Sequence, residues 1–136
     1  MRLAALSVDL DEIGCYAAIH GLAPPDEDAA RAIYRRALPR LRRLFADEGL
    51  AATFFVIGDD VDAENATALR ELHEAGHELA NHSAHHLYDL TRRPAEVIRA
   101  EVRGGVEAIE RACGVRPRGF RAPGYTVDDR VFEVLA

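Results

Sequence analysis

The sequence predicts an α/β protein in which parallel strands alternate with helices that cover them. Four short apolar runs alternate with segments in which apolar residues recur at helical spacing. We find no internal repeat and no low-complexity segment. This alternation implies parallel strands with helices outside, either in an open doubly wound sheet or in a barrel. The length of 136 residues allows one domain with a real hydrophobic core.

The first strand and helix are separated by a long loop. The strand is expected over residues 3–10, "LAALSVDL", an apolar run that ends in acids. A loop rich in Gly and Pro follows through residues 20–28. A helix is expected over residues 28–48, with Gly49 as its stop, and Pro39 either kinks it or starts a second helix. Its apolar positions are Ile33, Ala37, Leu38, Leu41, Leu44 and Phe45.

The rest of the chain continues the alternation. Three further strands are expected, at residues 51–58, 77–81 and 118–123. The three further helices are expected at residues 63–75, 91–114 and 127–136. The run "AATFFVIG" at residues 51–58 is the clearest strand because it is dense in β-branched and aromatic residues. Gly76 and Gly114 end the first two of these helices, and Pro94 lies near the start of the second.

Composition excludes some classes of partner. The net charge of −6 provides no global field toward nucleic acid or an anionic membrane surface. The arginines of "RRALPRLRRL", residues 35–44, lie between the apolar positions and form a solvated outer face. Cys15 and Cys113 have no metal-ligand spacing and fit a reducing compartment. The apolar run at the N-terminus is too short for a signal peptide or a membrane span, so a cytoplasmic location is expected.

Three unusual stretches follow expected strands. They are "SVDLDE" at residues 7–12, "NHSAHH" at residues 81–86 and "FRAPGY" at residues 120–125. In parallel α/β proteins the functional groups gather at the carboxyl ends of the strands. We therefore expect the three stretches to meet at one edge of the sheet.

The side chains of these stretches suit a metal centre. His82 and His86 are four residues apart, so a helical turn would place both on one face. Asp9 and Asp11 alternate along a strand and would point the same way. Two histidines and one carboxylate leave coordination positions open, as in catalytic zinc sites. The second aspartate could then act as general base on a metal-bound water.

The remaining histidines receive other assignments. His85 is expected to lie outside the ligand set or in solvent, His73 on the surface, and His77 in a structural role. His20 lies on the long loop after the first strand and could reach the site.

The three stretches, in this order, resemble the first three motifs of the polysaccharide deacetylase family, also called NodB-type carbohydrate esterases. The resemblance covers nearly the whole chain and includes "ATFFVIG" and "LHEAGHELANHS". It implies an α/β fold that corresponds to the N-terminal four β/α units of a distorted (β/α)7 barrel. It also implies metal-dependent hydrolysis of an N-acetyl or related acyl group on an amino sugar.

The same resemblance assigns roles to individual residues. Asp9 resembles the catalytic base, which Arg121 orients through a charge-assisted pair. The ligands of one divalent metal ion, zinc by expectation, are Asp11, His82 and His86. A backbone N–H near Gly124 or Tyr125 is expected to stabilise the oxyanion, and Gly124 leaves room for close approach.

The chain departs from the family pattern at two places. Leu10 separates two aspartates that are adjacent in many members, and this variant resembles a subgroup that acts on peptidoglycan, lipid-linked sugars or small amides. The family's late histidine, which protonates the leaving amine, is expected beyond residue 136. Residues 1–136 are therefore expected to form a single, incomplete domain. Its open sheet edge would favour self-association.

Two other functional classes remain open at this stage. The chain could be a non-catalytic fragment or pseudoenzyme that binds metal or sugar without an acid. It could also be a response-regulator-like switch, since acids after the first strand suit a magnesium-dependent phosphoacceptor pocket, although the histidines have no role there. For an enzyme, a cytoplasmic location favours a nucleotide- or lipid-linked sugar, and a deformylase or small-amide hydrolase fits the same residues.

Overall fold

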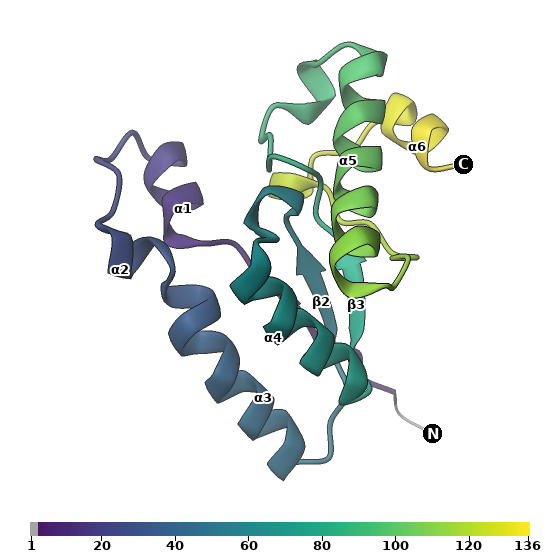
Figure 1. Cartoon of the computed structure of the whole chain (residues 1–136). Coiled ribbons are helices and arrows are strands. Elements are labelled where there is room, and N and C mark those ends of the chain that lie inside the picture. The colour runs from purple at the N-terminus through teal and green to yellow at the C-terminus, as the bar shows by residue number, and fades with distance from the viewer. Residues whose placement is uncertain (1–2) are drawn as a thin grey trace.

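The computed structural model describes residues 3–136, which form a parallel sheet covered by helices (Figure 1). The strands are β1 (Ser7–Asp9), β2 (Thr53–Val56) and β3 (Glu78–Asn81), and they pair in the order β1-β2-β3. Asp9 is in register with Phe55, and Phe55 with Ala80. The expected class, α/β with parallel strands, is confirmed. The first strand is shorter than the expected residues 3–10, and Asp11 lies two residues beyond its end.

The expected fourth strand is wrong as a regular element. Residues 118–123 form only one isolated parallel bridge, between Phe120 and Asn81. The Asn81 amide donates to the Gly119 carbonyl at 2.9 Å, and the Arg121 amide donates to the Asn81 carbonyl at 3.0 Å. Pro117 and Pro123 bound this stretch, and neither can donate to a ladder of hydrogen bonds. The segment nevertheless lies beside β3 and brings Arg121 to the sheet edge.

The helices agree with the sequence best where spacing and stop signals coincide. The helical segments are α1 (Ile13–Ile19), α2 (Glu27–Ala30), the π-helix η1 (Ile33–Ala37), α3 (Leu38–Asp47), α4 (Ala63–Glu74), α5 (Ala95–Cys113) and α6 (Asp129–Leu135). Short 3-10 helices are η2 (Gly58–Asp60), η3 (Leu90–Arg92) and η4 (Pro123–Tyr125). The expected single helix over 28–48 is divided into three segments, and Pro39 lies in the first turn of the last one. The sequence analysis missed α1, which lies between the expected first strand and the Gly- and Pro-rich stretch at residues 20–28.

The hydrophobic core lies between the sheet and the helices. In Figure 1, α4 and α5 pack side by side across β2 and β3. Phe54 is fully buried, and its ring meets the His77 ring edge-on at 5.3 Å. The Ala52 amide donates to His77 Nδ1 at 3.2 Å, which confirms the structural role expected for His77. Within residues 3–136 we find no helix with the length and apolarity needed to cross a bilayer.

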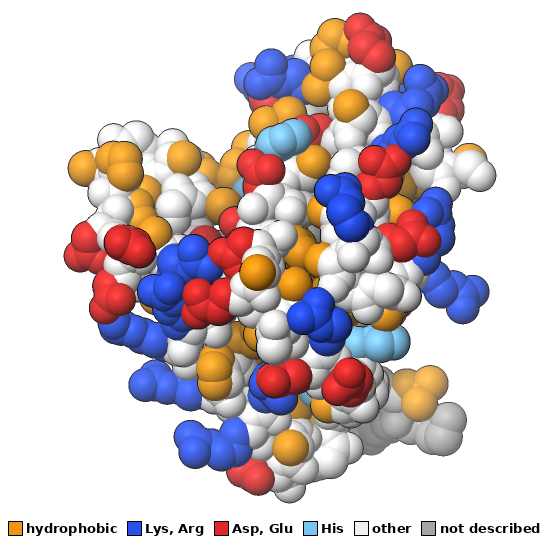
Figure 2. All heavy atoms as spheres, viewed as in Figure 1, with side chains coloured by type: hydrophobic (Ala, Val, Ile, Leu, Met, Phe, Trp, Pro, Cys, Tyr) orange, Lys and Arg blue, Asp and Glu red, His pale blue; other side chains and the backbone are white. Residues whose placement is uncertain are grey.

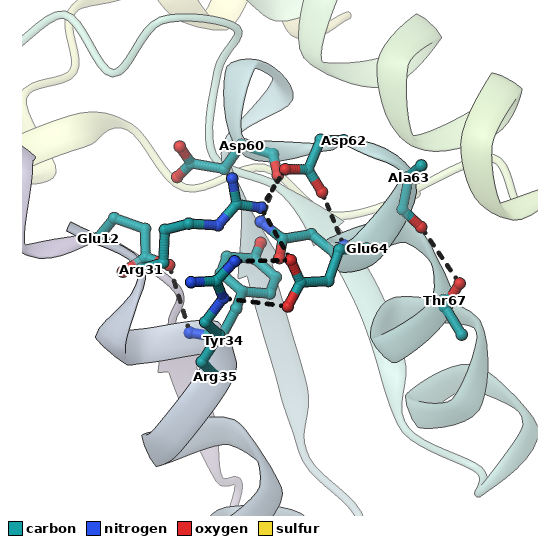
Figure 3. A network of polar contacts seen from close by, with 10 residues as sticks. Glu12, Arg31, Tyr34, Arg35, Asp60, Asp62, Ala63, Glu64 and Thr67 are labelled. Carbon is teal, nitrogen blue, oxygen red and sulfur yellow. Dashed lines mark hydrogen bonds and ion pairs between the residues drawn. The ribbon is translucent and has the colours of Figure 1, made fainter. Parts of the chain in front are cut away.

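A network of ion pairs fastens the segment after α1 to the start of α4 (Figure 3). Arg31 pairs with Asp62 and lies 3.4 Å from a Glu64 carboxylate oxygen. Arg35 binds Glu64 through two parallel hydrogen bonds of 3.1 Å. Isolated exposed pairs of this kind contribute little, but forked geometry and shared partners increase their effect. The network therefore holds the α2–α3 segment against α4.

Two acids, Glu12 and Asp60, lie close to this network (Figure 3). Glu12 accepts hydrogen bonds from the amides of Ile33 at 3.0 Å and Tyr34 at 3.3 Å. Asp60 Oδ2 and the Tyr34 hydroxyl are buried and have no hydrogen-bond partner. Burial, together with the negative charges of Glu12 and Asp59, raises the pKa of Asp60 to about 7.

Asp60→Asn is expected to remove a pH-dependent loss of stability. Because the folded-state pKa is raised, the folded chain binds one proton more than the unfolded chain between about pH 4 and 7, so stability falls as pH rises through this window. Between pH 5 and pH 8, the free energy of unfolding of the variant should rise relative to the parent by about 1–3 kcal/mol. Urea unfolding in metal-free buffer measures it. Exposed Asp47→Asn is the control, and parallel profiles for Asp60→Asn and the parent would contradict the assignment.

Candidate metal centre

The three unusual stretches meet at the carboxyl ends of the strands. Asp9 is the last residue of β1, and Asp11 follows two residues later. His82 comes directly after β3, and Arg121 lies in the segment bridged to β3. Figure 2 shows the molecule hollowed between α1 and the part that contains α4 and α5. A cavity of about 690 Å³ opens there beside His86.

Asp11, His82 and His86 form a compact triangle of donor atoms. His82 Nε2 lies 3.2 Å from His86 Nε2 and 3.4 Å from Asp11 Oδ1. His86 Nε2 lies 3.3 Å from Asp11 Oδ2. Among residues 3–136, this is the one group of three or more His, Cys, Asp or Glu residues close enough to share a metal ion.

The residues of this triangle fit a divalent metal. Ligands arranged tetrahedrally at about 2.1 Å from zinc stand about 3.4 Å apart, which matches the three separations. His82 Nδ1 lies 2.7 Å from the Arg121 carbonyl oxygen. Because a carbonyl only accepts, Nδ1 holds the proton and Nε2 presents its lone pair to the centre. Asp11 Oδ1 is buried without a hydrogen-bond partner, as expected of an oxygen that awaits a cation.

The electrostatics favour the forms of His82 and Asp11 that bind a cation. Burial lowers the pKa of His82, which favours the neutral imidazole. For Asp11, burial alone would raise the pKa. The hydrogen bond with His86 and the charges of His86, His82 and Arg121 outweigh it, so the pKa of Asp11 is lowered. A neutral imidazole and an ionised carboxylate are the ligand forms that a metal requires.

The expected helical turn between His82 and His86 is wrong. The histidine loop (residues 81–86) turns through left-handed backbone at Ser83, φ 68°, and at His86, φ 57°. Asn81 Oδ1 accepts from the Ser83 amide, and Ser83 Oγ accepts from the His86 amide, each at 3.0 Å. Side-chain acceptors of this kind compete with helical hydrogen bonds. The two imidazoles converge because the loop folds back, and not because they share a helix face.

Asp9 stands beside the triangle and is held by Arg121. The guanidinium pairs with Asp9 Oδ1, donates to Ser7 Oγ at 2.8 Å, and lies 3.9 Å from the centroid of the Phe55 ring. The backbone carbonyl of Arg121 lies beside the His82 ring, within hydrogen-bond distance of Nδ1. Arg121 therefore fixes Asp9 with its side chain and the tautomer of His82 with its backbone.

Gly124 and Tyr125 lie in η4, and both have left-handed backbone, with φ 59° and 57°. A Cβ at Gly124 would meet the Tyr88 ring at 2.9 Å, so the Tyr88 ring packs against the space that the missing side chain leaves. The amide of Tyr125 donates to the Ala122 carbonyl at 3.0 Å. The Tyr125 side chain is 75% exposed and lies over the Arg121 guanidinium at 5.9 Å.

The other histidines lie outside the triangle. His20 is exposed at the end of α1, and His73 is exposed in α4. His85 is exposed, and its pKa is raised by a hydrogen bond to Glu101. The sequence analysis missed Glu101, although a signal was present. Glu101 lies on the buried stripe of α5, between Ile98 and Ile109.

The fold and the site together define a parallel α/β protein with an open His-His-Asp centre at the carboxyl edge of its sheet. The family model for polysaccharide deacetylases matches residues 27–136. The chain therefore belongs to the polysaccharide deacetylase family.

Individual relatives agree with this membership. A chitooligosaccharide deacetylase of Bradyrhizobium sp. (strain ANU 289) is 41% identical over 62% of this chain and 38% of its own length. A peptidoglycan-N-acetylglucosamine deacetylase of Bacillus cereus is 30% identical over 70% of this chain and 43% of its own length. The solved Xyl-CE4 domain of a multidomain xylanase, from the hindgut metagenome of Trinervitermes trinervoides, superposes with a TM-score of 0.72 at 26% identity. That match covers 95% of this chain and 52% of the solved chain. This chain therefore spans about half of the length of that structure, and less than half of the length of the two deacetylases.

Proposed function

We propose that the chain contains the metal-binding and base-bearing part of a zinc-dependent hydrolase that removes an N-acyl group, acetyl or formyl, from an amino sugar. The single observation that supports this most strongly is the triangle of Asp11, His82 and His86 with the Asp9–Arg121 pair beside it. Family membership and the names of the relatives support a deacetylation on a glycan.

The ligands in this proposal are His82 Nε2, His86 Nε2 and the Asp11 carboxylate. A divalent ion held there supplies Lewis-acid polarisation of the acyl carbonyl and makes a bound water more acidic. Two imidazoles and one carboxylate are a donor set typical of catalytic zinc sites, which keep a position for water and substrate.

Asp9 is the general base in this proposal. Its carboxylate takes one proton from the attacking water while the water oxygen forms a bond to the acyl carbon. Arg121 orients Asp9. In this proposal a backbone N–H near Gly124 or Tyr125, other than the Tyr125 amide that donates to the Ala122 carbonyl, stabilises the developing oxyanion. The C–N bond then breaks, and the leaving amine takes a proton from an acid that we do not assign among these residues.

The relatives and the spacing of Asp9 and Asp11 support the proposed substrate class. Both curated relatives are named for amino-sugar polymers or oligomers. We extend this to an acylated amino sugar for the present chain, in a cytoplasmic, nucleotide- or lipid-linked form. A chain that binds zinc but releases no acid from such sugars would instead have a binding role.

Native mass spectrometry with zinc tests the proposal directly. The parent chain is expected to bind one zinc ion, His86→Ala is expected to lose it, and exposed His73→Ala is expected to keep it. The same spectra show whether the chain self-associates. Acetate release from N-acetylated chitooligosaccharides is measured beside it, in this chain and in any longer chain that contains it. Failure of the parent to bind zinc at micromolar concentration would overturn the proposal.

A further inference from the structure

The histidine loop has a conformation that the rest of the molecule must impose. Ser83 and His86 both occupy the left-handed region, which favours glycine, and neither is glycine. Each such residue is strained relative to ordinary backbone. Such strain persists only where surrounding contacts determine the conformation. The question is which part of the fold supplies those contacts.

One contact comes from Glu101, a carboxylate that is only 4% exposed on α5. Its Oε2 accepts from the His85 amide at 2.9 Å, and its Oε1 accepts from His85 Nδ1–H at 2.6 Å. Burying a carboxylate is unfavourable unless charge-assisted hydrogen bonds compensate for the lost hydration. Here both hydrogen bonds go to His85, which lies between the two proposed ligands His82 and His86.

A second contact is the close approach of the α5 backbone. A Cβ at Gly105 would lie 2.0 Å from Asn81 Oδ1 and 2.9 Å from the Ser83 carbonyl carbon. A Cβ at Gly104 would lie 3.0 Å from the Ala84 Cβ. Asn81 Nδ2 also donates to the Val102 carbonyl at 2.8 Å. Glycine inside a helix is less stable than alanine, and the close packing that Gly104 and Gly105 permit offsets this cost.

Glu101 and Gly105 are four residues apart, so they lie one above the other on the same face of α5. The Glu101 carboxylate accepts from the His85 amide. The absence of a side chain at Gly105 leaves space for Asn81, whose side chain accepts from the Ser83 amide. The loop is thus fixed at its start and just before its end. Neither Glu101 nor Gly105 is among the three residues that supply donor atoms to the triangle.

We propose that Glu101 and the Gly104–Gly105 pair of α5 are positioning residues that hold the histidine loop in the conformation that converges His82 and His86. The inference rests on the proposed function for its chemical consequence, since the positioned atoms are the proposed zinc ligands. In this inference α5 supports the histidine loop, although α5 itself contributes no residue to the triangle.

The test combines a metal-free and a metal-bound measurement. In metal-free protein, Glu101→Gln and Gly105→Ala should exchange the His85 and His86 amide hydrogens at least about tenfold faster than the parent. Amides of β2 should be unchanged. Zinc affinity should fall by about tenfold, because supporting residues of a metal site typically contribute 10- to 100-fold. The absorption bands of the cobalt-substituted chain should also change. Glu96→Gln, an exposed acid at the start of the same helix, is the matched control.

The outcomes separate this inference from the proposed function. Unchanged loop exchange in Glu101→Gln overturns the positioning role, whether or not zinc binds. Faster exchange in a parent-like fold supports it, even if the parent itself binds no zinc, in which case the proposed function alone fails. If Gly105→Ala does not fold, Glu101→Gln decides, because glutamine keeps the volume and one acceptor of glutamate.

Discussion

In the proposed hydrolase, Asp9→Asn is expected to lower kcat/KM for release of the acyl group by about 10²- to 10⁴-fold, the range typical of general bases. Asparagine has nearly the same shape and can still accept from Arg121, so the site should keep its geometry. It cannot take a proton from water. Because Asp9 is not among the three residues of the triangle, zinc affinity should stay within about threefold of the parent. That corresponds to a change in binding free energy of less than about 1.4 kcal/mol, the amount for a tenfold change in Kd.

Kinetics with an N-acetylated chitooligosaccharide and a zinc titration on the same preparation measure both effects. Asp129→Asn, which removes an exposed acid at the start of α6, is the control and should leave both quantities unchanged. Loss of zinc together with activity would reverse the assignment. Asp9 would then be a ligand, and Asp11 would be the candidate base.

The parts of the fold that the sequence predicts best are those with several agreeing signals. In α4, apolar spacing and the stop at Gly76 indicate the same helix, and the expected 63–75 differs from the observed bounds by one residue. In α5, the long run of helical spacing and the stop at Gly114 likewise indicate one helix. By contrast, α1 has only seven residues and its N-cap position lacks a side-chain hydrogen bond, so it has no clear local sequence signal.

The candidate site was predictable in its composition but not in its geometry. The rule that parallel strands gather functional groups at one edge places Asp9, Asp11, His82 and Arg121 together without any side-chain detail. The histidine spacing also selects the two imidazoles that converge with Asp11. The helical turn inferred from that spacing was wrong, because the Asn81 and Ser83 side chains satisfy amides that a helix would use.

Glu101 illustrates why the remainder escaped the sequence. An acid in a helix is normally exposed, so pattern reasoning assigns it to solvent. Its partner amide belongs to His85, sixteen residues away, in a loop whose path is set by α5 itself. Such a contact depends on tertiary structure. Only the position of Glu101 on the apolar stripe hinted at it.

Arg121→Lys is the second large effect, with an expected loss in kcat/KM of about 100-fold, at the upper end for residues that orient a catalytic group. Lysine keeps the positive charge, but it cannot pair with Asp9, donate to Ser7 and stack on Phe55 with one planar group. Zinc affinity should change little, because His82 Nδ1 binds the backbone carbonyl of residue 121, which the substitution retains.

This split makes Arg121→Lys diagnostic when it is compared with Glu101→Gln in the same two assays. Arg130→Lys, at an exposed arginine that pairs with Asp128, is the control for the chemical change itself. If the side chain of Arg121 serves Asp9 and its backbone serves His82, Arg121→Lys reduces turnover with zinc bound, whereas Glu101→Gln reduces zinc binding first. A parallel fall of zinc affinity and kcat/KM in Arg121→Lys would show that the side chain also shapes the metal centre. Turnover and zinc affinity that both match the parent would mean that Asp9 needs no such support.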